Sequence, residues 1–235
     1  MTERAGYEEF LAQAKDGRNV SIRIRIRTRT FILVWQKALC ENKFRAIEQA
    51  MMYSNACDIT GIVAIACARH GCFAPNSIVN LYRGEQQKNV DWAFLESLRT
   101  TRVQRDQGVM LFYDIPCQYF VYLDDRIGHL LPPGLQIDRA IGLFHVHGHK
   151  EECFFRYSPS FIPFCGVVAG EILESLWANL NTITPAARTA TLAHRTEIID
   201  DHASDSNYKK AISMGGLFFG LCGRRSHQYH SISAL

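Results

Sequence analysis

Three histidines and one cysteine fall within the segment FHVHGHKEECF, residues 144–154. The side chains of His145, His147 and His149 would share one face if this segment were a strand, because strand side chains alternate between faces. If a helix begins within the segment instead, His149 and Cys153 lie one turn apart on the same face. Imidazole and thiolate both bind metal ions, so the spacing indicates a metal site. The plainer alternative is a loop of unligated polar residues.

An earlier cysteine could complete a set of four ligands. Cys117 follows one apolar segment and His145 ends another, so both could reach one edge of a sheet. Two thiolates and two imidazoles without a carboxylate are typical of a closed, structural zinc site. We therefore expect Zn²⁺ to be bound by Cys117, His145, His149 and Cys153, with His147 outside the site. An open site built from the three histidines, as in a metal-dependent hydrolase, is the alternative.

Acidic residues form a second candidate site. Asp114 ends the apolar segment GVMLFYD, and open α/β sheets bind ligands beyond the carboxyl ends of their strands. Glu171 and Glu174 are three residues apart near the start of an expected helix, so they would share one face. Carboxylates that converge from separate elements can hold Mg²⁺ or Mn²⁺, often as two ions ~3.5–4 Å apart. The structural alternatives are a helix cap for the aspartate and dipole compensation for the glutamates.

Strands that alternate with helices are expected to position these residues. Apolar, β-branched segments predict strands at residues 60–68, 77–82, 108–114 and 140–146. Apolar spacing and breakers predict helices at residues 7–15, 41–52, 90–100, 117–131, 170–181 and 191–211. This order indicates a layered α/β domain.

The composition is globular, with 47% hydrophobic and 21% charged residues among 235. The sequence begins without a signal-peptide core, and no apolar segment reaches the ~20 residues that a membrane span needs. We therefore expect a protein that is not secreted and has no membrane partner, with its eight cysteines as thiols or metal ligands. The net charge of +3 gives little support for nucleic-acid binding. Alternating arginines at residues 23–29 would either contact phosphates or protect an edge strand.

Five segments resemble, in the same order, the KDZ (Kyakuja-Dileera-Zisupton) transposases of fungal genomes. They are TGIVAIACARHGCFAP, RGEQQKNVDWAFLESLR, FYDIPCQYF, FHVHGHKEECFFRYS and GEILESLWANLNTITPAARTATLAHRTEIIDDHASDSNYKK. With the upstream segment CENKFRAIEQA, the resemblance covers about residues 40–210. It implies an RNase H-like domain, a mixed sheet with flanking helices, that uses Mg²⁺ or Mn²⁺ to cleave and transfer DNA strands. It also implies a nuclear protein whose partner is DNA.

The resemblance assigns roles to particular residues. Asp114 matches the second of three catalytic acids, and Glu171 or Glu174 matches the catalytic glutamate of the family. The family's cysteine and histidine positions fall on Cys117, His145, His149 and Cys153. Ala169 stands where the family has an aspartate before Gly170. The first catalytic aspartate of the family has no counterpart here before residue 60.

These departures predict a truncated copy that lacks the first strands of the domain. We expect residues 1–39 to be a remnant or a non-family segment, 40–214 a partial RNase H-like core, and 215–235 a flexible tail. A two-metal site loses a ligand when one acid is missing, so we expect no activity from the chain alone. The alternatives are a zinc-stabilised binding module without catalysis and a metal-dependent hydrolase built on the histidines.

Overall fold

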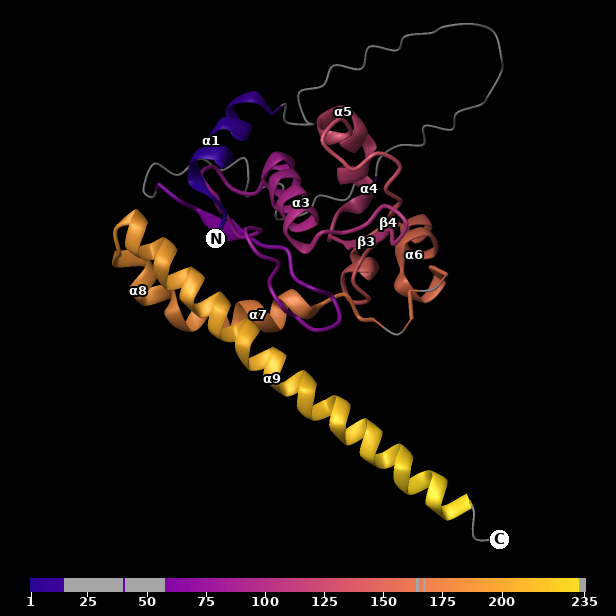
Figure 1. Ribbon diagram of the computed structural model, residues 1–235. Helices are drawn as coiled ribbons and strands as arrows, with labels where there is room; N and C mark the ends of the chain where they lie inside the picture. Colours follow the sequence, from indigo (N-terminus) through magenta and orange to yellow (C-terminus); the bar gives the residue numbers. More distant parts are fainter. Residues whose placement is uncertain (15–39, 41–57, 164, 167, 233–235) are drawn as a thin grey trace, which may run out of the picture. The chain divides into compact units, whose positions relative to one another are not determined.

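The computed structural model describes residues 1–14, 40, 58–163, 165–166 and 168–232. Over these residues the protein is mixed α/β, with many helices and two short sheets (Figure 1). The chain divides into two compact units. Unit 1 consists of Met1–Arg69 and Ala74–Glu171, and unit 2 consists of His70–Phe73 and Ile172–Leu235.

The N-terminal helix belongs to the core of unit 1. The first elements of this unit are α1 (Arg4–Gln13), the antiparallel strands β1 (Gly61–Val63) and β2 (Val79–Leu81), and α3 (Gln87–Thr101). Tyr7 of α1 packs with Val79 and Ala93 and is only 1% exposed. Its hydroxyl donates to the carbonyl of Asn80 at 2.7 Å and accepts from the amide of Asn89 at 2.5 Å. A buried phenol with both of its hydrogen-bonding functions used fixes α1 against the helix and strand beneath it.

Helix α3 forms the centre of the largest hydrophobic cluster. Its start is a capping box, in which Gln86 and Asn89 exchange side-chain and backbone hydrogen bonds. Three apolar side chains at helical spacing, Val90, Phe94 and Leu98, face this cluster and are at most 6% exposed. The helix expected at residues 90–100 is confirmed and starts three residues earlier.

A buried ion pair joins α3 to the helices that follow it. These are α4 (Pro116–Tyr119), the 3-10 helix η2 (Phe120–Tyr122) and α5 (Leu123–Ile127). Arg126 donates to both carboxylate oxygens of Asp91, at 2.7 and 3.0 Å, and also to the carbonyl of Tyr119 at 3.1 Å. The side chains of Arg126 and Asp91 are 2% and 1% exposed. Each charge therefore depends on the other for the solvation that water would supply.

A parallel strand pair carries the candidate site. Strands β3 (Val109–Phe112) and β4 (Ile137–Ala140) run side by side, with Val109 opposite Ile137 and Phe112 opposite Ala140. The crossover that two parallel strands require contains α4 and α5. Because both strands point the same way, the residues after Phe112 and after Ala140 leave the sheet at the same edge.

The strand predicted at residues 140–146 is wrong in its extent, because β4 ends at Ala140. From Ile141 onward the backbone finds other partners: Ile141 donates to the carbonyl of Tyr157 at 2.9 Å, and Leu143 donates to that of Ala169 at 2.9 Å. The chain then forms the 3-10 helices η3 (His145–Gly148) and η4 (Pro159–Phe161), with α6 (Glu151–Tyr157) between them. The three histidines therefore do not alternate along a strand.

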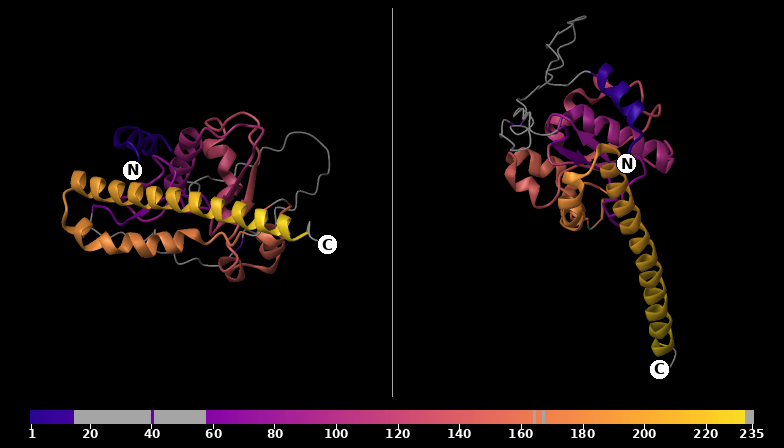
Figure 2. Two further views of the ribbon diagram at one scale, coloured as in Figure 1. Left: turned by 60° about the horizontal axis from the view of Figure 1, so that its bottom comes forward. Right: turned by 90° about the vertical axis from the view of Figure 1, so that its left-hand side faces the viewer.

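Unit 2 is helical. It contains α7 (Ile172–Leu180), the 3-10 helix η5 (Asn181–Ile183), α8 (Thr184–Thr189) and α9 (Leu192–Ile232), drawn in orange and yellow in Figure 2. Asn207 of α9 holds Phe73 by two hydrogen bonds, and the Phe73 ring contacts Trp177 of α7. Helix α9 continues through the segment 215–232, where the sequence predicts a flexible tail. Among the described residues, no helix combines the length and the apolar character that crossing a membrane requires.

The main difference from the predicted architecture concerns the sheet. The family resemblance implies a mixed sheet with flanking helices, whereas the described residues form two separate two-stranded sheets. The helix expected at residues 7–15 is confirmed as α1. The alternating Arg/Ile segment and the helix expected at residues 41–52 lie outside the described residues.

Candidate metal centres

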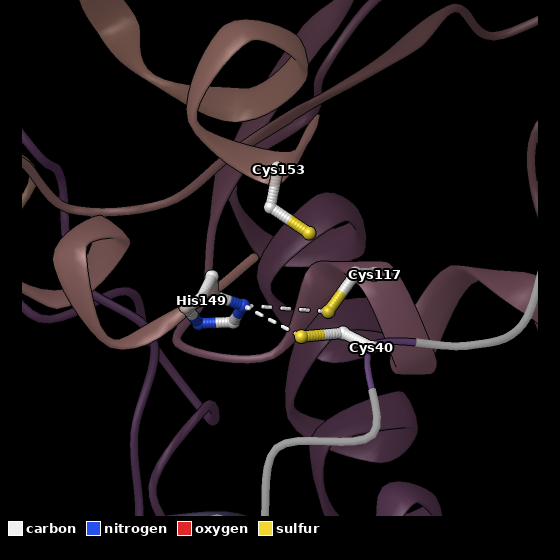
Figure 3. Close-up of side chains that lie close together, drawn as sticks. All are labelled: Cys40, Cys117, His149 and Cys153. Atoms are coloured by element: carbon white, nitrogen blue, oxygen red, sulfur yellow. Dashed lines mark hydrogen bonds between the residues drawn. The ribbon is translucent and has the colours of Figure 1, made fainter. Parts of the chain in front are cut away.

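Three thiols and one imidazole converge in unit 1. One ligand atom from each of Cys40, Cys117, His149 and Cys153 lies within 4.8 Å of the others, so the group could hold a metal ion (Figure 3). The Nδ1 atom of His149 faces two sulfurs, with the Cys117 Sγ at 3.5 Å and the Cys40 Sγ at 3.8 Å. Cys40 and Cys153 are buried, and the other two side chains are half-buried.

The four residues come from separate parts of the chain. Cys117 lies in α4, Cys153 lies in α6, and His149 follows the end of η3. Cys40 is fixed by a hydrogen bond from the side chain of Gln118 to its carbonyl, at 2.9 Å. The sulfurs of Cys40 and Cys153 also belong to a small buried cluster with Ile141 and Val146. Neighbouring helices and apolar packing thus bring the ligands together.

The distances from His149 to two of the sulfurs fit a tetrahedral ion. Zn–S bonds of ~2.3 Å and Zn–N bonds of ~2.0–2.1 Å keep the ligand atoms about 3.5–3.8 Å apart. The observed separations from His149 Nδ1, 3.5 and 3.8 Å, fall in this range. Burial lowers the pKa of His149, which favours the neutral imidazole that can bind a metal. Burial also raises the pKa of the Cys117 and Cys153 thiols, and Cys40 adds to both shifts, whereas a hydrogen bond with Cys117 opposes the shift at Cys153.

The structure differs from the sequence prediction in one ligand. Cys40 takes the place that the sequence assigns to His145, while Cys117, His149 and Cys153 are brought together. The sequence carries little signal for Cys40, because it precedes His149 by 109 residues. His147, expected to lie outside the group, is exposed, and its ring is tilted by 36° to that of Phe154 with 5.8 Å between the ring centroids.

His145 instead lies between two carboxylates at the edge of the parallel strands. Its Nδ1 atom is 3.0 Å from Glu171 Oε2, and its Nε2 atom is 3.7 Å from Asp114 Oδ2. The Asp114 side chain is 62% exposed, whereas that of Glu171 is only 20% exposed. Desolvation by nearby atoms raises the pKa of Asp114, and His145 opposes this shift. Asp114 and Glu171 thus approach opposite sides of one imidazole ring.

Two glycines allow the close packing of the chain around Glu171. A Cβ atom at Gly142 would collide with Glu171 Oε1, and one at Gly170 would collide with the Phe112 ring. Gly170 also has a φ of +77°, which is strained for any other residue. The carboxylate can therefore lie against the backbone after β4 because Gly142 has no side chain, and the absence of a side chain at Gly170 lets the chain before Glu171 pass close to Phe112.

Glu174, the other predicted acid, lies in α7 of unit 2 and is exposed. It is the third residue of that helix, where a negative charge offsets the helix dipole.

Glu85 is a further acid near the site, and the sequence patterns did not single it out. It accepts a hydrogen bond from the hydroxyl of Tyr113, the residue before Asp114, at 2.6 Å. Burial raises the pKa of Glu85; the bond from Tyr113 lowers it, and the charge of Asp114 raises it further. Glu85 lies between β2 and α3 without any periodic pattern around it, so only the folded chain reveals this contact.

Replacing Glu85 with glutamine is expected to stabilise the protein at neutral pH. A carboxyl group whose folded pKa lies above its unfolded value of ~4.3 favours folding in its protonated form, and this contribution is lost as pH rises. Glutamine is neutral at every pH and can still accept the bond from Tyr113. Urea denaturation should give a higher midpoint for Glu85→Gln than for wild type at pH 7.5, and the difference should shrink towards pH 4. Exposed Glu9→Gln is the control; equal midpoints for all three proteins at pH 7.5 would contradict the assignment.

Taken together, the site and fold define an α/β protein with carboxylates at the edge of a parallel strand pair and a buried cysteine–histidine group. The family model of the Kyakuja-Dileera-Zisupton (KDZ) transposases matches residues 3–207, so the chain belongs to the KDZ transposase family. The match begins at residue 3, well ahead of residue 40, at which the sequence predicts that the family core begins. Neither the curated proteins nor the solved structures give a match.

Proposed function

We propose that this chain is a transposase-derived, DNA-binding protein that holds a divalent metal ion at Asp114. The observation that carries the proposal is the placement of Asp114, His145 and Glu171 at the carboxyl edge of β3 and β4 in a KDZ family member. That edge is where open α/β sheets bind ligands, and an RNase H-like fold would use it in the same way. Action on chromosomal DNA would also mean a nuclear location.

The donor set suits Mg²⁺ or Mn²⁺, because both ions prefer carboxylate oxygens. When bound, such an ion positions a phosphate and activates a water molecule. Asp114 offers the more open carboxylate, and Glu171 lies on the other side of His145. We propose that the chain alone does not cleave DNA, because a pair of ions needs more carboxylates than these two.

We propose that the ion of the cysteine–histidine group is zinc with a structural role. Three thiolates and one imidazole complete a tetrahedral shell and leave no position for water or substrate. Two members of the group are close in sequence to residues of the acidic edge. Cys117 follows Asp114 by three residues, and His149 follows His145 by four. A fully coordinated zinc ion here would hold in place both segments that carry residues of the acidic edge. A zinc-stabilised binding module without any catalytic ancestry would share this ion but would not need Asp114.

Mn²⁺ binding measured by electron paramagnetic resonance separates these functions. Zinc-loaded wild-type protein is expected to bind Mn²⁺, and Asp114→Ala to weaken this binding about tenfold or more, the scale of losses at metal sites. Asp138→Ala removes an exposed carboxylate from β4 and should leave Mn²⁺ binding unchanged. Equal Mn²⁺ binding by wild type and Asp114→Ala would refute the proposal.

The same proteins should bind duplex DNA with an affinity that falls steeply with salt, since phosphate contacts dominate such complexes. Supercoiled plasmid incubated with wild type and Mn²⁺ is expected to stay intact. Nicking by wild type that is lost in Asp114→Ala would show that the chain has a complete catalytic site.

A further inference from the structure

The imidazole of His145 is oriented by Glu171. The separation of 3.0 Å between His145 Nδ1 and Glu171 Oε2 is that of a hydrogen bond, so Nδ1 carries the proton and donates to the carboxylate. When the ring is neutral, this tautomer has its lone pair on Nε2. Nε2 is the ring atom that faces Asp114.

Glu171 itself is committed to the protein. Its Oε1 atom accepts from the backbone N–H of Phe144 at 2.7 Å and from that of His145 at 3.3 Å. Its Oε2 atom is occupied by the imidazole. Both carboxylate oxygens are thus used at the start of η3, in the way that an acidic side chain caps a helix. This arrangement makes Glu171 a poor direct ligand and a good holder of the ring.

We infer that His145 binds the divalent ion through Nε2 beside Asp114, and that Glu171 acts as the positioning residue that holds the imidazole. This inference rests on the proposed function and changes which residue shares the ion with Asp114. The 3.7 Å between Nε2 and Asp114 Oδ2 exceeds a hydrogen bond. It lies close to the separation of two ligands of one ion, since bonds of ~2.0–2.2 Å leave neighbouring ligand atoms roughly 2.8–3.6 Å apart. A carboxylate that receives the other N–H of a metal-binding histidine is a common supporting contact.

An imidazole ligand changes which ion the site selects. Mg²⁺ strongly prefers oxygen ligands, whereas Mn²⁺ and later transition metals also accept imidazole nitrogen. The site should therefore bind Mn²⁺ more tightly than Mg²⁺. A site made of carboxylates alone would discriminate less between the two ions.

Mn²⁺ affinity and Mg²⁺ competition, measured on zinc-loaded full-length protein, test the inference. His145→Ala is expected to weaken Mn²⁺ binding about tenfold or more, and Glu171→Gln by about 10–100-fold through loss of ring orientation. His145→Asp, which replaces nitrogen with oxygen, is expected to lower the preference for Mn²⁺ over Mg²⁺. His147→Ala removes an exposed ring in the same segment, and this variant should have the Mn²⁺ affinity and the ion preference of wild type. A purely structural role for His145 would not move the ratio of the two affinities.

The outcomes separate this inference from the proposed function. If Asp114→Ala loses Mn²⁺ while His145→Ala and His145→Asp keep both the affinity and the ion preference, the role of His145 is refuted and the metal site stands. If Asp114→Ala binds Mn²⁺ as wild type does, the proposed function fails as well. Circular dichroism of each variant shows whether a loss of binding reflects a loss of fold.

Discussion

Wild-type protein is expected to carry one zinc ion per chain, and protein with Cys153 replaced by serine is expected to lack this zinc and to lose much of its folding stability. Structural zinc binds zinc-finger peptides with apparent free energies of ~10–16 kcal/mol, and that free energy is part of the folding free energy. A whole domain is stable by only ~5–15 kcal/mol. Atomic absorption and thermal unfolding measure the two effects, and a chelator should reproduce them in wild type.

Two further variants decide which residues bind the zinc. Cys40→Ser is expected to release the ion, whereas His145→Ala is expected to retain it, because Cys40 and not His145 lies with the other ligands. The opposite pattern would restore the ligand set predicted from sequence.

Zinc affinity should also rise with pH between 6 and 8, since burial raises the pKa of the Cys117 and Cys153 thiols and binding must displace their protons.

Replacing Asp91 with alanine is expected to destabilise unit 1 by ~3–5 kcal/mol, the cost of leaving one charge of a buried pair without its partner. The Arg126 guanidinium, 2% exposed, would lose the two hydrogen bonds that it donates to Asp91. Chemical denaturation followed by the fluorescence of Trp92, on the same helix, measures the change.

The matched control is the pair Arg99–Glu96, on the same helix at 2.7 Å, whose arginine is 64% exposed. Arg99→Ala should cost less than ~1 kcal/mol, because exposed pairs contribute little. The double replacement Asp91→Leu with Arg126→Met should recover much of the loss, since apolar residues of similar volume can replace a buried pair. If Asp91→Ala costs no more than Arg99→Ala, the buried pair does not stabilise the fold.

Local patterns in the sequence predict the helices well and the edges of the strands poorly. Helix α3 is recognisable because its apolar residues follow one face over fifteen residues. Strand β4 has the sequence IDRA and the apolar run lies after it, so the sequence places the strand too late. Ala140, Ile141 and Val146 of this run are buried, and Ile141 is hydrogen-bonded to Tyr157 and not to a neighbouring strand, whereas Leu143 and Phe144 are exposed. An apolar run alone therefore does not define a strand.

The same limit of local sequence patterns explains why one predicted ligand of the cysteine–histidine group differs in the structure. His149 and Cys153 could be paired from their spacing, because they lie within one local segment. The sequence groups His145 with them because it ends an apolar segment expected to be a strand, whereas β4 ends at Ala140 and His145 lies in the 3-10 helix η3. Cys40 and Glu85 reach their sites only through tertiary packing, and no spacing in the sequence encodes such contacts.

The tight packing of Gly142 and Gly170 around Glu171 has a consequence for the evolution of this gene. A substitution at either glycine would displace Glu171 or Phe112 without touching any charged residue. In a genetic screen for loss of function, the two glycine codons should therefore behave like the codon for the glutamate. If the acidic edge is under selection as proposed, that selection extends to positions that carry no side chain, and drift at those two codons would mark a copy released from it.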